Sequence, residues 1–103
     1  MRIKYLGALA LALLIAPAAQ ASEELAKKYN CLACHQTDKK LVGPSYQEVA
    51  AKYKDQADAP ATLAKKIKEG GVGVWGQIPM PPNPTVPDAD LSALVTWILG
   101  MAK

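Results

Sequence analysis

Residues 31–35 read Cys-Leu-Ala-Cys-His and hold both cysteines and the single histidine of the 103-residue chain. On a helical turn, side chains three and four positions apart share one face. Cys31, Cys34 and His35 should therefore point to the same side. We expect these three side chains to act together on one bound group.

The spacing C-x-x-C-H is the attachment pattern of c-type haem. The two thiols can add across the vinyl groups of one porphyrin edge while His35 presents its imidazole to the iron. The motif also permits a thioredoxin-like dithiol, a structural zinc site or a Cys31–Cys34 disulfide. No strand pattern flanks the motif, and no fourth zinc ligand is evident. We predict one haem c per chain, covalently bound through Cys31 and Cys34.

Residues 1–21, upstream of the motif, have the form of a secretory signal. Arg2 and Lys4 precede an apolar stretch over residues 5–15, and residues 19–21 read Ala-Gln-Ala, a small-x-small cleavage site. The stretch is shorter than the roughly 20 residues of a membrane span. We predict cleavage after Ala21 and a periplasmic protein without stable membrane insertion. The alternative is an uncleaved N-terminal anchor.

Removal of 21 of the 103 residues leaves 82 and changes the composition. Without Arg2 and Lys4, ten basic and nine acidic residues remain, and the net charge falls from +3 to about +1. No arginine follows Arg2, which argues against a nucleic-acid partner. A chain of this length holds one domain, and its five aromatic residues are few for a core. We expect the bound group to fill the centre of the fold.

Helix signals recur through residues 22–103, whereas strand alternation is nearly absent. We predict four helices: from Ser22 into Cys31, from the capping box at Ser45 to about Tyr53, from Pro60 in a first turn to Gly70-Gly71, and from about Asp88 onward. Residues 37–44 should form a loop. Residues 70–87, hereafter the methionine loop, contain five prolines and should be rigid and non-helical. The fold class is therefore all-α.

The second axial ligand cannot be a histidine, because His35 is the only one. Of the two methionines after residue 21, Met80 lies between prolines in the methionine loop, whereas Met101 continues the apolar stripe of the last helix. A thioether favours ferrous iron and raises the reduction potential. We predict His35 and Met80 as the iron ligands. Alternatively, Met80 packs against the haem without bonding the iron.

With these residues in place, the chain resembles the small bacterial class I cytochromes c, in particular the cytochrome c-551 type. The likeness covers essentially all of residues 22–103 and includes Cys-Leu-Ala-Cys-His at 31–35, Leu-Val-Gly-Pro-Ser-Tyr at 41–46 and Gly-Val-Trp-Gly-Gln-Ile-Pro-Met-Pro-Pro-Asn at 73–83. The resemblance implies one cytochrome c domain over 22–103, in which about four helices wrap one covalent haem beside a Pro/Gly-rich methionine loop.

The resemblance also implies roles for residues around the iron. The carbonyl of Pro44 would accept the free ring N–H of His35, and Asn83 would hydrogen-bond near the Met80 sulfur. Trp75 would reach a haem propionate.

In this family an arginine of the third helix often pairs with a propionate. Lys66, or else Lys65, is the candidate here, and a lysine lacks the bidentate fork of arginine. Apart from the resemblance, we expect seven apolar side chains around the porphyrin: Leu25, Leu63, Ile67, Trp75, Leu94, Trp97 and Ile98.

Iron with both axial positions filled by protein has no open site for a substrate, which favours electron transfer over catalysis. The resemblance implies a soluble periplasmic carrier, not an enzyme, that takes electrons from a quinol-oxidising membrane cytochrome complex. The acceptor would be a terminal reductase or oxidase, such as haem nitrite reductase, or a peroxidase. We expect a monomer. The alternatives are a haem enzyme or gas sensor with a labile Met80, and a binding module with an oxidised dithiol.

Four lysines flank the motif in sequence and could steer acidic redox partners to the haem edge: Lys27, Lys28, Lys39 and Lys40. The competing interpretation is that they are ordinary solvated side chains.

Overall fold

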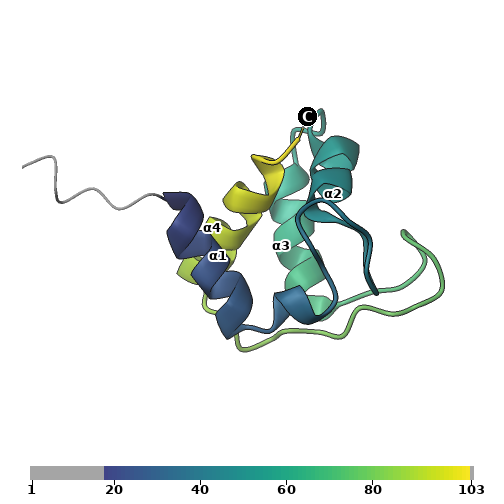
Figure 1. Ribbon diagram of the computed structural model, residues 1–103, viewed down its shortest axis with the longest axis horizontal. Helices are drawn as coiled ribbons and strands as arrows, with labels where there is room; N and C mark the ends of the chain where they lie inside the picture. Colours follow the sequence, from purple (N-terminus) through teal and green to yellow (C-terminus); the bar gives the residue numbers. More distant parts are fainter. Residues whose placement is uncertain (1–17, 103) are drawn as a thin grey trace, which may run out of the picture.

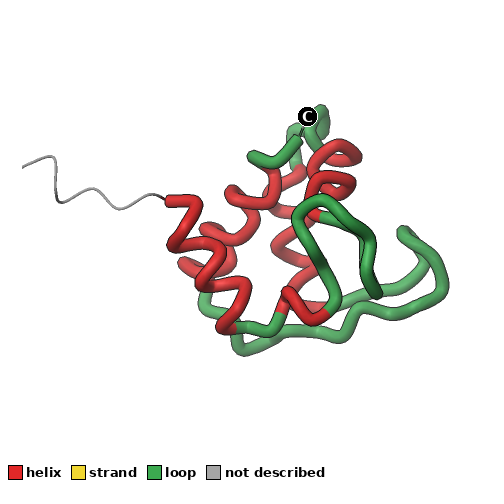
Figure 2. Tube along the Cα trace, viewed as in Figure 1, coloured by secondary structure: helices red, strands yellow, loops and turns green. Residues whose placement is uncertain are grey.

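The computed structural model describes residues 18–102, so most of the expected secretory signal lies outside the described part. The described helices are α1 (Ala18–Lys28), α2 (Tyr46–Tyr53), α3 (Ala59–Glu69) and α4 (Asp88–Leu99), with a 3-10 turn η4 (Cys31–Ala33) after α1 (Figure 1). Between residues 18 and 102 there are isolated β-bridges but no strands (Figure 2), which agrees with the all-α prediction. None of these helices is both long enough and apolar enough to span a membrane.

Helix α1 differs from the prediction at both ends. Its described part already includes residues 18–21, upstream of the predicted start at Ser22, and these residues are mostly alanine, which favours helix. Ser22 is buried inside the helix, and its hydroxyl donates a hydrogen bond to the Ala93 carbonyl at 3.4 Å. The helix ends at Lys28 rather than running into Cys31. Asn30 adopts a left-handed conformation, with φ of 62°, and this starts a new turn at the cysteines.

Helices α2 and α3 begin where the sequence predicts. The Ser45 hydroxyl accepts the Glu48 backbone N–H at 3.1 Å, and the Glu48 carboxylate accepts the Ser45 N–H at 3.1 Å. These two bonds form the expected capping box of α2. Pro60 lies in the first turn of α3, and Gly70 caps its last turn with φ of 72°.

Helix α4 is the central element, because it packs against α1, α2 and α3. The predicted apolar stripe of α4 is buried through Leu91, Leu94, Val95 and Ile98. The core has two parts. One joins α2, α3 and α4 through Tyr46, Val49, Tyr53, Ala59, Leu63, Val95 and Ile98. The other joins α1 and α4 to the end of the methionine loop through Ala26, Val86, Leu91 and Leu94.

The methionine loop leaves α3, runs along the helices and returns to α4 (Figures 1 and 2). It is non-helical throughout, as predicted. Its neck is a pair of backbone hydrogen bonds, in which the Met80 N–H donates to the Gly71 carbonyl at 2.7 Å and the Gly71 N–H donates to the Met80 carbonyl at 3.1 Å. The Asn83 N–H then bonds the Ile67 carbonyl at 3.0 Å, which ties the returning limb to α3. These contacts fix the base of the loop at the C-terminal end of α3.

Candidate cofactor site

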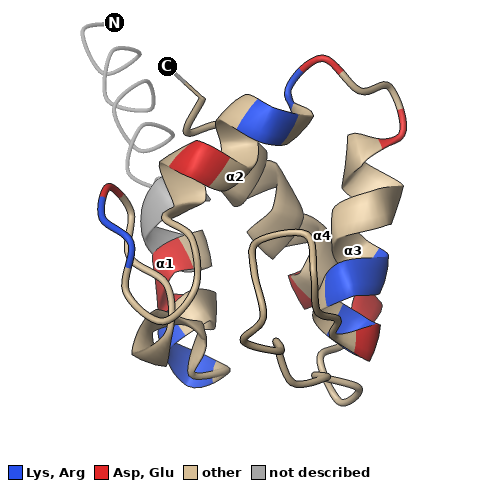
Figure 3. Ribbon diagram, turned by 90° about the vertical axis from the view of Figure 1, so that its right-hand side faces the viewer, with Lys and Arg blue, Asp and Glu red and all other residues tan. Residues whose placement is uncertain are grey.

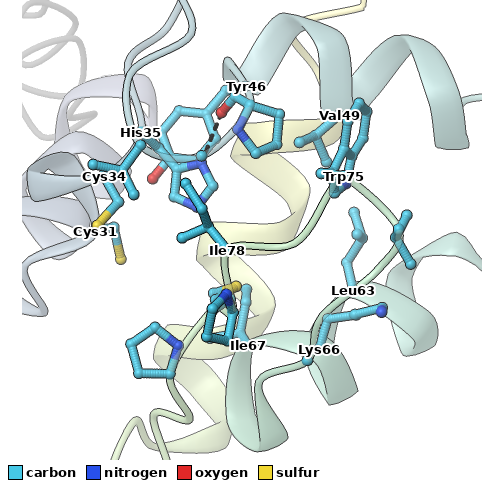
Figure 4. Close-up of a pocket in the computed structure, with 18 of the residues that line it drawn as sticks. Cys31, Cys34, His35, Tyr46, Val49, Leu63, Lys66, Ile67, Trp75 and Ile78 are labelled. Carbon is cyan, nitrogen blue, oxygen red and sulfur yellow. Dashed lines mark hydrogen bonds between the residues drawn. The ribbon is translucent and has the colours of Figure 1, made fainter.

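A cavity of about 390 Å³ lies between the cysteine motif, α2, α3, α4 and the methionine loop. Cys31, Cys34, His35 and Met80, which are distant in sequence, all line it. Figure 4 shows the two cysteines at one end of this cavity and Trp75 with Lys66 toward the other. Most of the remaining lining is apolar and includes Val49, Leu63, Ile67, Leu94 and Ile98. The cavity combines two thiols, an imidazole and a thioether with walls suited to a flat apolar group.

The turn η4 positions the two thiols. The backbone N–H groups of Cys34 and His35 both donate to the Cys31 carbonyl, at 3.2 and 3.1 Å, which winds the motif into one tight turn. Both cysteines are half-buried and unpaired. Burial raises the pKa of the Cys31 thiol, and a hydrogen bond with Tyr46 partly offsets the shift. Ionisation of the Cys31 thiol is therefore disfavoured at neutral pH.

Three contacts fix the plane of the His35 ring. Its Nδ1 lies 2.7 Å from the carbonyl oxygen of the buried Pro44, and its ring stacks on Tyr46 with centroids 5.2 Å apart and an interplanar angle of 20°. Gly43 passes so close that a Cβ there would lie 2.7 Å from His35 Cε1. With Nδ1 bound to a carbonyl, Nε2 is the nitrogen left to bond a metal.

Tyr46 is a site residue that the sequence did not reveal. It is buried, with 3% of its surface exposed, and it contacts Cys31, His35 and Trp97. Burial raises the pKa of its hydroxyl, so that it too stays neutral. In the sequence Tyr46 is only an aromatic residue in the first turn of a capped helix, a pattern that many core residues share.

Backbone geometry places Met80 on the cavity wall. The neck bonds to Gly71 hold its peptide groups, and at Gly70 any Cβ would collide with the Met80 carbonyl oxygen. The glycine pair that ends α3 therefore also permits the close approach of the Met80 backbone. Met101 lies beyond the end of α4, packs against the main core and does not line the cavity.

The other residues that the resemblance implied are also present around the cavity. Trp75, Asn83 and the half-buried Lys66 line it, whereas Lys65 is exposed and does not. The Asn83 side-chain amide donates to the carbonyls of Ile67 and Pro81, both at 3.2 Å, rather than to the Met80 sulfur. Because the last carbonyls of a helix lack partners within it, this amide satisfies one of them at the end of α3.

Two of the seven expected porphyrin neighbours do not line the cavity. Trp97 lies one position before Ile98, about 100° away around α4, and packs edge-on against Tyr46 with centroids 5.3 Å apart. Leu25 packs against the core between α1 and α4. The other five, Leu63, Ile67, Trp75, Leu94 and Ile98, line it as expected.

The residues present fit a covalently attached haem and do not fit the alternatives. Two unpaired thiols and an imidazole share one apolar cavity, as the attachment of a porphyrin requires. Within residues 18–102, no three His, Cys, Asp or Glu side chains are grouped to hold a metal ion, which argues against zinc. A thioredoxin-like site lacks its strands in the same range.

Comparison with known proteins decides the family, because the profile of the cytochrome c family matches residues 19–102. The chain belongs to the cytochrome c family. It is 58% identical to cytochrome c-552 of Nitrosomonas europaea over 96% of this chain and 97% of the relative. It is 53% identical to cytochrome c-551 of Allochromatium vinosum, over 87% and 96% respectively. The crystal structure of Nitrosomonas europaea cytochrome c552 superposes with a TM-score of 0.75 at 59% identity, covering 77% of this chain and 98% of that one.

This cytochrome c is thus a small class I protein with the all-α cytochrome c fold. Haem c is bound covalently through Cys31 and Cys34. The protein is an electron carrier rather than an enzyme. Haem c supplies a centre that gains and loses single electrons, and the chain around the cavity sets its ligands, its surroundings and its access to partners.

Proposed function

We propose that this cytochrome c is a periplasmic single-electron carrier whose haem iron is ligated by His35 and Met80. It would take electrons from a quinol-oxidising membrane cytochrome complex and pass them to a terminal reductase or oxidase, such as haem nitrite reductase. The observation that carries the proposal is the single cavity lined by Cys31, Cys34, His35 and Met80.

The contacts of His35 support its role as an axial ligand. Pro44 accepts from Nδ1, which fixes the tautomer and raises the basicity of the other nitrogen. Tyr46 and Gly43 confine the ring, so it does not have to be ordered when the iron binds.

The contacts of Met80 support a fixed sixth ligand. Its backbone is held at the neck of the methionine loop, and prolines on both sides restrict its own conformations. Protein ligands at both axial positions leave none for a substrate. Lys66 and Trp75 line the same cavity away from the cysteines, where they could contact haem propionates (Figure 4).

Carbon monoxide tests the proposed sixth ligand. The reduced wild-type protein should not bind carbon monoxide at neutral pH, because Met80 occupies the position. Met80→Ala should bind it rapidly and should show a lower reduction potential, since the thioether that favours ferrous iron is gone. The absorption spectrum and a redox titration measure both effects.

Met101→Leu is the matched control, because Met101 packs at the core and not at the cavity. It should change neither carbon monoxide binding nor the potential. Equal effects from the two substitutions would refute the ligand assignment. Rapid and complete binding by the wild type would favour a haem enzyme or gas sensor.

Exposed lysines on the cysteine side support docking to acidic partners. Lys28, Lys39 and Lys40 are exposed, and Lys40 also lines the cavity. Figure 3 shows basic residues at the C-terminal end of α1 and on the loop after the motif. Lys27 is partly neutralised by Glu24, whose carboxylate lies 3.7 Å away. We therefore expect Lys28, Lys39 and Lys40 to contribute most.

Salt dependence tests the steering. Oxidation of the reduced protein by the anionic reagent ferricyanide, used as a stand-in for an acidic partner, should slow as ionic strength rises. Lys40→Gln should flatten this dependence, whereas Lys54→Gln, at the far end of α2 and not at the cavity, should leave it nearly intact. A flat profile for the wild type would exclude electrostatic steering.

Residues 1–21 complete the proposal as a cleaved export signal. Mass spectrometry of the mature protein should find Ser22 as the first residue. An intact Met1 in the membrane fraction would favour the uncleaved anchor instead.

A further inference from the structure

Lys52 makes a contact with no assigned role in this cytochrome. Its Nζ lies 5.9 Å from the centroid of the Trp75 ring and 5.8 Å from that of Tyr53. A lysine ammonium within about 6 Å of an aromatic face is attracted by the ring quadrupole, most strongly by tryptophan. Both rings line the cofactor cavity, whereas Lys52 does not. The ammonium therefore approaches two cavity-lining rings from outside the cavity.

The tip of the methionine loop, residues 72–79, has few other ties. Its backbone is closed on itself by the Gly73 N–H, which donates to the Gly76 carbonyl at 2.9 Å. Among the described residues, no hydrogen bond joins this tip to a helix; the bonds to α3 begin only at Asn83. Gly73 and Gly76 have φ of 104° and 119°, so the backbone on either side of Trp75 has the conformational freedom of glycine.

Trp75 is thus placed by its side chain more than by its backbone. It is 41% exposed, and within residues 18–102 the ammonium that lies over its ring belongs to Lys52 on α2, a helix held by its capping box and buried through Val49 and Tyr53. Helix α2 can therefore restrain residues 72–79, which have no hydrogen bond to a helix among the described residues.

We infer that Lys52 is a positioning residue that holds the Trp75 indole against the cavity and so keeps the tip of the methionine loop closed over the haem. The role rests on the cation–π geometry and the sparse hydrogen bonding of residues 72–79. It depends neither on which proteins exchange electrons nor on the sixth ligand of the iron.

Hydrogen exchange of single amides in the reduced holoprotein tests this role. The Gly73 amide reports opening of the tip, and the Met80 amide reports opening of the neck. Lys52→Met, which keeps the aliphatic stem and removes the charge, should speed exchange at Gly73 about two- to fivefold and leave Met80 nearly unchanged. Lys52→Arg, which keeps a cation able to stack on the ring, should restore the wild-type rate.

Two further variants separate positioning from a general effect of charge or stability. Lys54→Met removes the same charge at the end of α2, and exchange at Gly73 should stay at the wild-type rate. In a Trp75→Leu background, Lys52→Met should have no further effect on Gly73. The inference is overturned if Lys54→Met matches Lys52→Met, or if Lys52→Met is equally effective without the indole.

Discussion

At the scale of single residues, the site depends on a glycine that touches the proximal histidine. A Cβ at Gly43 would lie 2.7 Å from Cε1 and 3.1 Å from Nδ1 of His35, closer than such atoms approach without something moving. The imidazole cannot retreat easily, because it is stacked on Tyr46 and hydrogen-bonded to Pro44. The space at Gly43 is therefore part of the geometry of the iron site.

We expect Gly43→Ala to destabilise the holoprotein by about 1–3 kcal/mol, the usual cost of overpacking. Guanidinium unfolding measures the loss, and the absorption spectrum should show a disturbed axial ligand. Gly100→Ala is the control, since a Cβ there meets its nearest atom, the Thr96 carbonyl oxygen, at 3.4 Å. Equal stability of the two variants would contradict the proposed contact.

At the scale of elements, a hydrogen bond between two side chains links the residue after α1 to the first turn of α4. The Tyr29 hydroxyl donates to Asp90 Oδ2 at 2.6 Å. This bond, together with burial and the negative charge of Asp90, raises the pKa of Tyr29 above its ordinary value of 10.0. The folded state therefore favours the neutral phenol more than the unfolded state does.

The sign of the pH dependence follows from this shift. The stabilisation is complete below about pH 10 and is lost as the pH rises through the raised pKa of Tyr29. Tyr29→Phe should lower the free energy of unfolding at pH 7, and the gap between variant and wild type should close under alkaline conditions. Denaturant titrations at pH 7 and above pH 10 measure this gap. A gap that stays constant with pH would refute the linkage.

The elements that the sequence predicted well carry local signals. Ser45 with Glu48, Pro60 and Gly70 mark helix ends through chemistry within a few residues, so α2 and α3 begin and end as expected. The end of α1 was missed because a left-handed Asn30 is one outcome among several that an asparagine permits. Residues 18–21 are also helical, although we predicted the helix from Ser22, because alanines favour helix without marking where it starts.

The site residues likewise fall into those that carry a local sequence signal and those that do not. The C-x-x-C-H spacing identifies Cys31, Cys34 and His35 in the sequence. The prolines on both sides of Met80 single it out as a candidate ligand. Tyr46 and Lys52 contact residues that are distant in sequence, so no local pattern marks them. Trp97 lies one position away from the cavity-lining Ile98 on α4 and faces Tyr46 instead. Which face of a helix meets a cofactor is fixed by packing, and periodicity alone does not resolve one position.

At the scale of the whole molecule, the cofactor cavity is large for so short a chain. Unfilled volume costs about 24 cal/mol per Å³, so 390 Å³ corresponds to at most about 9 kcal/mol, because the cavity is open to solvent on one side. A small domain has only about 5–15 kcal/mol of stability in total. We therefore expect the fold to depend on its haem.

We expect the double variant Cys31→Ala/Cys34→Ala, which cannot form thioethers, to lack cooperative folding when it is purified without haem. Circular dichroism during heating should show a broad change with reduced helix content, in contrast to the sharp transition of the wild-type holoprotein. A colourless variant with native helicity and a sharp transition would contradict this expectation.

The neck of the methionine loop has a consequence for how such proteins diversify. Two backbone hydrogen bonds between Gly71 and Met80 close the loop independently of the side chains inside it. We therefore expect substitutions and length changes within residues 72–79 to leave the backbone of Met80 in place, as long as Gly70 and Gly71 are kept. Variation in this segment would alter the surroundings of the haem and the surface beside it more than the helical frame.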